Sequence, residues 1–277
     1  GLLREVADLT GLSGQVTDVL ADTYRGPWMY APGAVFADLA ELLDGIPSAR
    51  LFDETLKLFL GGKAERTFEL LLEYDLFAPL FPASAAALER NPEYAGTLIR
   101  NALANTDLRI QQGKPVTPAF LFAALLWPAL PARVLELQDR GMPPIPAMQE
   151  AAHDIIWEQC QRTAIPKRFT IPMREIWDMQ ERLPRRQGRR ADQLLENPRF
   201  RAGYDFLLLR ESAGEKTGGL GDWWTDYQEA NDSERRNMIR DLVSQEDGSA
   251  PRKRRRGGNS GRRRRGPRKE GSGGSGE

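Results

Sequence analysis

Arginine side chains gather in one stretch of the chain, from residue 165 to residue 210. This stretch holds eleven Lys or Arg and six Asp or Glu, a net charge of +5. At its centre, Arg185, Arg186, Arg189 and Arg190 lie within six residues with no carboxylate among them. Planar guanidinium groups bind phosphate through paired hydrogen bonds. The cluster therefore predicts a surface for a polyanion, and the alternative interpretation is a charged face that contacts only water.

The surrounding residues indicate what positions this cluster. If the segment is helical, Arg185 faces Arg189 and Arg186 faces Arg190, and each like-charge pair costs roughly a few tenths of a kcal/mol. Apolar residues on both sides indicate a folded helical scaffold: Ile176, Trp177, Leu183, Leu194, Leu195, Phe200, Tyr204 and Phe206. We therefore expect a phosphate backbone to contact Lys167, Arg168, Arg185, Arg186, Arg189, Arg190, Arg199 and Arg201.

A second basic segment covers residues 248–277, with eleven bases, two acids and very few apolar residues. Such a composition cannot offset the entropy of ordering, so we expect a disordered tail. The tail should contact nucleic acid with little sequence preference, and a solubilising or localisation role is the alternative. The tail cations assigned to RNA are Arg252, Lys253, Arg254, Arg255, Arg256, Arg262, Arg263, Arg264 and Arg265. Residues 1–164 are acidic, at −8, as are residues 211–247, at −6, and the whole chain is neutral.

The hydrophobic pattern predicts an all-α fold. Helical periodicity occurs at 46–60, 64–76, 93–111, 118–127 and 147–163, and no run alternates with period two over several strands. Residues 118–127 are apolar on nearly all sides, which predicts the buried centre of the domain. This run is shorter than the roughly 20 residues that span a bilayer. Trp223, Trp224 and Tyr227 stand at helical spacing, and we interpret them as a packing face rather than as stacking partners of bases.

No catalytic motif occurs in this sequence. It has one cysteine, Cys160, and one histidine, His153, too few for a zinc site or a disulfide framework. Phosphate-binding loops, nucleophile elbows and Asp-x-Asp pairs are all missing from it. The residues alone predict a binding module. A single cysteine and no visible signal peptide favour the cytoplasm, and a start at Gly1 in mid-pattern suggests a fragment of a longer protein.

One predicted helix carries a charged face. Arg50, Asp53, Glu54 and Lys57 are spaced at i, i+3, i+4 and i+7, opposite an apolar face. The spacing predicts two ordinary ion pairs, Arg50–Glu54 and Asp53–Lys57.

Several ordered segments resemble bacterial poly(A) polymerases. Residues 45–59 and 71–82 look like the neck of that family. The resemblance continues in order through residues 105–109, 118–124, 164–168, 184–190, 197–201 and 223–224 to the arginine-rich end. It implies an all-α, multi-helix neck and body of a class II nucleotidyltransferase-type protein with a disordered basic C-terminal tail. The segments would be an unassigned 1–34, neck-like helices at 35–82, an RNA-binding body at 83–247 and the tail at 248–277.

The resemblance also implies a function. The intact family enzyme adds AMP from ATP to RNA 3′ ends with Mg²⁺ and without a template, using a head that carries an Asp-x-Asp pair. We therefore assign no catalytic residue, metal ligand or cofactor to this chain. By the match to the family's charged neck motif, Arg50, Asp53, Glu54 and Lys57 would lie near the nucleotide, with the ion pairs as the alternative.

The partners implied are single-stranded RNA 3′ ends, a nucleotidyltransferase head and RNA-degradation or RNA-chaperone proteins, with no membrane. Two other functions remain open. One is the body of a tRNA CCA-adding nucleotidyltransferase, and the other is a stand-alone RNA-binding adaptor.

Overall fold

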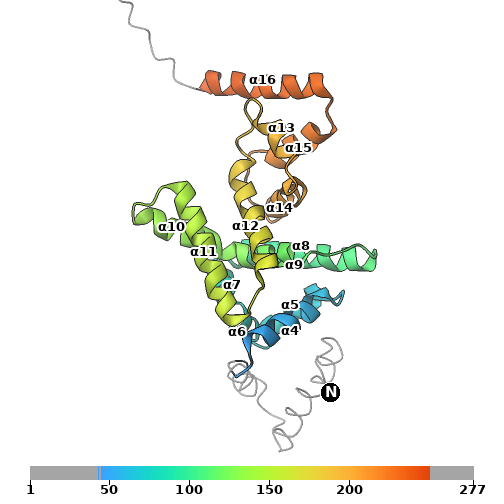
Figure 1. Cartoon of the computed structure of the whole chain (residues 1–277), viewed down its shortest axis with the longest axis vertical. Helices are drawn as coiled ribbons and strands as arrows, with labels where there is room; N and C mark the ends of the chain where they lie inside the picture. Colours follow the sequence, from blue (N-terminus) through green and yellow to red (C-terminus); the bar gives the residue numbers. More distant parts are fainter. Residues whose placement is uncertain (1–42, 44, 250–277) are drawn as a thin grey trace, which may run out of the picture.

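The computed structural model describes residue 43 and residues 45–249 (Figure 1). Within this part of the chain every regular element is a helix and no β-strand occurs, which confirms the all-α prediction. The predicted basic tail cations and residues 1–34 lie outside the described residues, as do residues 35–42 and 44 of the predicted neck-like segment.

The first helices pack next to one another, and α4, α5 and α7 contact α8. They are α4 (Ser48–Leu60), α5 (Ala64–Glu73), α6 (Phe77–Leu80), α7 (Pro82–Arg90) and α8 (Pro92–Gln111). Gly62 turns the chain between α4 and α5 at a φ of 79°, a backbone conformation that glycine adopts without strain. Asp107 of α8 then accepts hydrogen bonds from the backbone N–H groups of Ala64 (2.7 Å) and Glu65 (3.1 Å). These bonds satisfy free donors at the start of α5 and fasten α5 to α8.

The centre of the protein is α9 (Pro118–Leu126), which continues through the 3-10 turn η1 (Trp127–Ala129) into α10 (Leu130–Asp139). Phe122 and Leu125 are fully buried, so the predicted buried centre is confirmed. By length and composition, Pro118–Asp139 could cross a membrane, with a mean hydropathy of 1.5. However, 61% of its most apolar window is buried inside the protein, and a core helix passes the same test.

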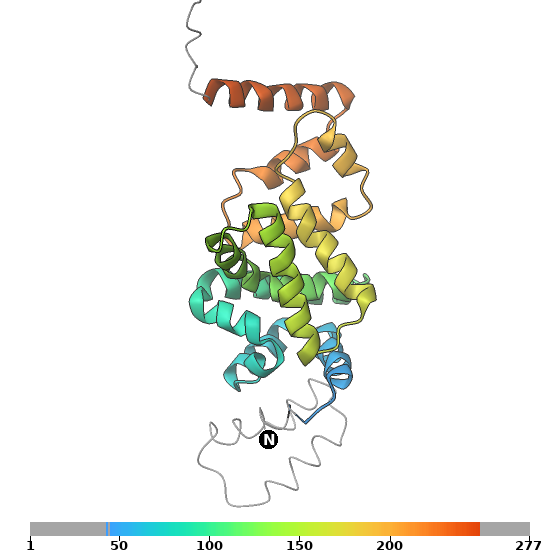
Figure 2. The same ribbon diagram turned by 60° about the vertical axis from the view of Figure 1, so that its left-hand side comes forward.

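The remaining helices are α11 (Pro144–Arg162), α12 (Lys167–Arg182), α13 (Arg190–Leu195), α14 (Phe200–Ser212), α15 (Leu220–Glu229) and α16 (Asp232–Ser249). In both views α16 lies at the opposite end of the molecule from α4 and α5 (Figure 1, Figure 2). α12 runs between these ends.

Buried side chains form two hydrophobic cores, and α12 belongs to both. Trp177 of α12 packs in the larger core, which takes residues from the helices α4 to α12 and from α14. Met179 of α12 packs in the smaller core with Trp224 and Tyr227 of α15. Trp224 and Tyr227 are fully buried and Trp223 is half-buried, which confirms that these aromatics form a packing face.

The helices α8, α12 and α14 are joined by a polar network around Arg210. The Arg210 guanidinium donates to Gln180 Oε1 (2.9 Å) and pairs with the Glu215 carboxylate. The Tyr94 hydroxyl donates to Glu215 (2.7 Å) and accepts from Trp127 Nε1 (3.1 Å). Burial and the Glu215 charge raise the pKa of Tyr94. Burial alone would raise the pKa of Glu215, but the hydrogen bond and charge of Arg210 lower it.

Candidate nucleic-acid interface

The predicted arginine cluster lies at the link between α12 and α13, and its last member, Arg190, is the first residue of α13. We call these four arginines, together with Arg182 at the end of α12, the arginine loop: Arg182, Arg185, Arg186, Arg189 and Arg190. The link is not helical, so the condition for the like-charge helical pairs is not met. α12 ends at Arg182, two residues before Pro184, which has no backbone N–H with which to continue the helix. Gly188, at a φ of 64°, turns the chain into α13.

This loop is anchored to the smaller core. The fully buried Leu183 accepts a hydrogen bond from Trp224 Nε1 through its backbone carbonyl (3.1 Å). The Arg186 guanidinium lies 4.7 Å from the centre of the Trp223 ring, and Trp223 stacks on Tyr227 at 4.7 Å. The Tyr227 hydroxyl donates to Asp192 (2.6 Å), and burial together with Asp192 raises the pKa of Tyr227. A rigid base therefore holds the loop.

The remaining arginines of the loop extend into solvent. Arg182, Arg185, Arg189 and Arg190 are all exposed. Among the described residues, no carboxylate forms an ion pair with any of these four side chains. Their positive charges are consequently available to an anion, with little reorganisation of the loop.

The other predicted cations lie elsewhere on the scaffold. Arg199, just before α14, pairs with Glu175 of α12 (2.6 Å), and Arg201 pairs with Asp205 (3.0 Å). Lys167 and Arg168 open α12, so the 16 residues of that helix separate them from the arginine loop by roughly 24 Å. The structure therefore does not gather all eight predicted residues at one place.

Two arginines omitted from the predicted site, Arg174 and the loop residue Arg182, extend the positive surface along α12. Arg174 and Arg182 are exposed on one side of α12, with Asp178 between them at four-residue spacing. Burial raises the pKa of Asp178, and the two arginines oppose that shift. Lys167, seven residues before Arg174, lies on the same face because seven residues make about two helical turns. A helical projection of 167–182 could have found this stripe once the bounds of α12 were known.

The charged face of α4 is arranged differently from the prediction. Lys57 pairs with Glu54 at i,i+3 (2.9 Å), and neither predicted i,i+4 pair forms between these described residues. Glu54 is mostly buried, and its second carboxylate oxygen has no hydrogen-bond partner. Lys57 donates to the other oxygen, Oε1. Arg50 and Asp53 are exposed, and a position near a nucleotide stays a prediction.

The described residues were also searched for a metal site and for a reactive side chain. Within 45–249, no three His, Cys, Asp or Glu side chains are grouped so as to hold a metal ion. Burial raises the pKa of the Cys160 thiol, whose sulfur contacts the Ile165 carbonyl (3.7 Å). A raised pKa disfavours the reactive thiolate. The described helices instead hold the arginine loop at the surface. This arrangement is typical of the nucleic-acid-binding class of proteins.

Comparison with known proteins identifies the family. Residues 140–269 match the family model described as "Polymerase A arginine-rich C-terminus". Residues 34–88 match "Probable RNA and SrmB- binding site of polymerase A". Poly(A) polymerase I of Salmonella typhimurium is 42% identical over 238 residues, which are 84% of this chain and 50% of that protein. The Haemophilus influenzae enzyme of the same name is 40% identical over 74% of this chain and 46% of its own.

The chain therefore belongs to the bacterial poly(A) polymerase family. It spans about half the length of the curated relatives that it matches. The matched region includes the RNA-binding and arginine-rich parts that the two family models describe. The resemblance to bacterial poly(A) polymerases predicted from the sequence is confirmed.

Proposed function

We propose that this chain holds single-stranded RNA behind its 3′ end for a polymerase that adds AMP from ATP without a template. The observation that carries the proposal is the anchored arginine loop, in which Arg185, Arg189 and Arg190 are exposed and form no ion pair with a carboxylate of the described residues. Together with the stripe along α12, the loop would neutralise successive phosphates. Family membership supports RNA as the polyanion.

The charge distribution favours α12 and the arginine loop for the phosphate contacts. Residues 45–88, within the region named for RNA and SrmB binding, carry four bases and six acids. A net negative surface repels phosphates. We therefore assign the backbone contacts to α12 and the loop, and leave α4–α6 to a protein partner or to contacts with bases.

In this proposal the chemistry of AMP transfer occurs outside the described residues. Mg²⁺ and ATP would be bound by a nucleotidyltransferase head, because nucleotidyl transfer needs clustered carboxylates. The residues described here would bind and orient the strand, which keeps its 3′ end at a high effective concentration near the head. The setting would be the bacterial cytoplasm.

A salt titration tests the assignment of the loop. Binding of single-stranded oligo(A) should weaken with salt, with a slope of log K on log[salt] near −4 if about six phosphates are neutralised. The double variant Arg185→Ala/Arg189→Ala should make that slope shallower by about 1.4, since each contact contributes about 0.7. Fluorescence anisotropy at several salt concentrations measures both values. Arg186 is left unchanged because it packs on Trp223.

A matched control removes two exposed cations far from the loop in sequence, with Lys114→Ala/Arg140→Ala. This variant should keep the wild-type slope. Equal slopes for all three proteins would overturn the assignment. Transfer RNA competing far better than oligo(A) would favour the CCA-adding alternative, and RNA binding with no associated head would favour the adaptor.

A further inference from the structure

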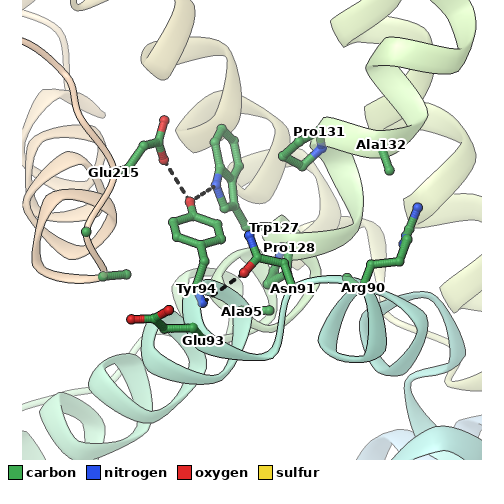
Figure 3. Close-up of a pocket in the computed structure, with 13 residues that line it drawn as sticks. Arg90, Asn91, Glu93, Tyr94, Ala95, Trp127, Pro128, Pro131, Ala132 and Glu215 are labelled. Carbon is green, nitrogen blue, oxygen red and sulfur yellow. Dashed lines mark hydrogen bonds between the residues drawn. The ribbon is translucent and has the colours of Figure 1, made fainter.

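A cleft of about 680 Å³ opens on another part of the surface (Figure 3). It lies between the α7–α8 junction, the start of α10 and the segment that follows α14. Pro128 and Pro131 form one side, and Ala87 and Ala95 contribute small apolar surfaces. This volume is within the range of small-ligand sites, which typically combine an apolar lining with a few polar groups.

One wall of the cleft is fixed before any ligand arrives. The Tyr94 hydroxyl is hydrogen-bonded to both Trp127 and Glu215 (Figure 3). The Glu215 carboxylate is in turn held by Arg210. These polar groups therefore already have partners within the protein. They keep the wall rigid and are not the groups that would recognise a ligand.

The polar groups still available come from three residues at the α7–α8 junction. Arg90 donates Nε–H to the Ala86 carbonyl (3.1 Å), which leaves its terminal N–H groups. Asn91 accepts the Tyr94 N–H with Oδ1 (3.3 Å), which leaves the two donors on Nδ2. The Glu93 carboxylate is exposed. A cation, an amide donor and a carboxylate acceptor thus line one side of an apolar cleft.

We infer that this cleft binds one nucleotide of the RNA strand. The base would lie against Pro131 and the Trp127 wall, and Asn91 would donate to a ring nitrogen. Glu93 would accept from an exocyclic amino group, and Arg90 would pair with the phosphate. The inference rests on the proposed function, because it assumes that the arginine loop holds the same strand.

The donor and acceptor pattern predicts base selectivity. Adenine and cytosine present an exocyclic amino donor beside an unprotonated ring nitrogen, whereas uracil presents an N3–H donor between two carbonyl oxygens. In the same pose uracil would place its N3–H against the Asn91 donors and a carbonyl oxygen against the Glu93 carboxylate, so both hydrogen bonds would be lost, which weakens binding. The cleft should therefore bind AMP more tightly than UMP, by roughly tenfold.

Titration of the protein with AMP, followed by calorimetry or NMR, tests the site separately from the arginine loop, since AMP has one phosphate. Asn91→Asp preserves an N-cap acceptor while removing the Nδ2 donors. The matched control is Asn231→Asp, because Asn231 caps the start of α16 by accepting from Ser233 (2.9 Å) and Glu234 (3.1 Å). Glu93→Ala is paired with Glu89→Ala, an exposed glutamate that does not line the cleft.

Saturable AMP binding should weaken roughly tenfold in Asn91→Asp and in Glu93→Ala, and remain at the wild-type level in both controls. Oligo(A) binding should weaken in the same two variants, while ribose 5-phosphate should not bind. AMP affinity that is unchanged by both variants, or UMP binding as tight as AMP, would overturn the inference. Weaker AMP binding with unchanged oligo(A) binding would overturn the assignment to RNA.

Two further outcomes separate the inference from the proposed function. Oligo(A) binding that depends on Arg185 and Arg189, with no binding of AMP, would overturn the cleft while the function stands. A proline-rich peptide that binds instead of AMP, and is lost in Asn91→Asp, would make the cleft a protein-docking site and would also overturn the inference.

Discussion

Arg185 and Arg186 are adjacent in sequence and of one type, yet they make different contacts. Arg186 is half-buried with its guanidinium over the Trp223 ring at 4.7 Å, whereas Arg185 is exposed. A planar guanidinium stacks on an aromatic face, and a lysine ammonium does not reproduce that packing. The same residue type therefore stabilises the loop at one position and is available to a ligand at the next.

Replacing each arginine by lysine should separate these contributions. Arg186→Lys keeps the charge and loses the stacked contact, so the free energy of unfolding should fall by about 1 kcal/mol. Arg185→Lys, the matched control, should change it by less than about 0.5 kcal/mol. Urea unfolding followed by circular dichroism measures both. Equal effects of the two variants would show that the Trp223 contact does not stabilise the fold.

At the scale of the helices, glycine marks the close crossing of α12 and α14. A Cβ at Gly203 would lie 2.3 Å from Met179 Cγ and 2.8 Å from Met179 Cβ. The second atom is attached directly to the backbone of α12, so the helices themselves would have to separate. Gly96 in α8 differs, because its nearest obstacle is the terminal Arg100 nitrogen at 2.9 Å, the mobile end of a long side chain.

Alanine substitutions at these two glycines should therefore change stability in opposite directions. Gly203→Ala should lower the free energy of unfolding by about 1–3 kcal/mol through overpacking. Gly96→Ala should raise it by about 0.5–1 kcal/mol, since glycine is a poor residue inside a helix and Arg100 can move. Thermal and urea unfolding provide the measurement. A stabilising Gly203→Ala would show that α12 and α14 can separate without loss of packing.

The helices were predictable from the sequence, and several of the contacts were not. Thr117-Pro118 and Gly61-Gly62 mark the start of α9 and the end of α4 where the structure has them. The predicted spacing of the ion pairs on α4 was wrong. Glu54 is mostly buried and pairs with Lys57 three residues away, and burial of this kind is not visible in the sequence. The cleft could not be predicted, since Asn91, Pro131 and Gly214 approach one another only in the folded chain.

At the scale of the whole molecule, one ionic contact helps to hold the two cores together. Arg210 at the end of α14 pairs with Glu215, which also accepts from Tyr94 of α8. Gln180 of α12 accepts from the same arginine. These groups connect elements of the larger core with the helices that support the arginine loop, so loss of the Glu215 charge should weaken the connection.

The free energy of unfolding, measured as the pH is lowered, should reveal this contact. The pKa of Glu215 is lowered in the folded protein from its ordinary value of 4.5. A lowered folded pKa means that the stabilisation is fully present above 4.5 and is lost as the pH falls through the folded value. Wild type should therefore exceed Glu215→Gln in free energy of unfolding at neutral pH, and the difference should shrink as the pH falls below about 4.5.

Urea unfolding of both proteins across this range measures the difference directly. Asp178, whose raised pKa acts in the opposite sense, is present in both proteins and cancels in the comparison. Glu229→Gln removes an exposed carboxylate of α15 and should show no such pH-dependent difference. A Glu215→Gln deficit that stays constant from neutral to acid pH would mean that packing, rather than the charge paired with Arg210, carries the contribution of this residue.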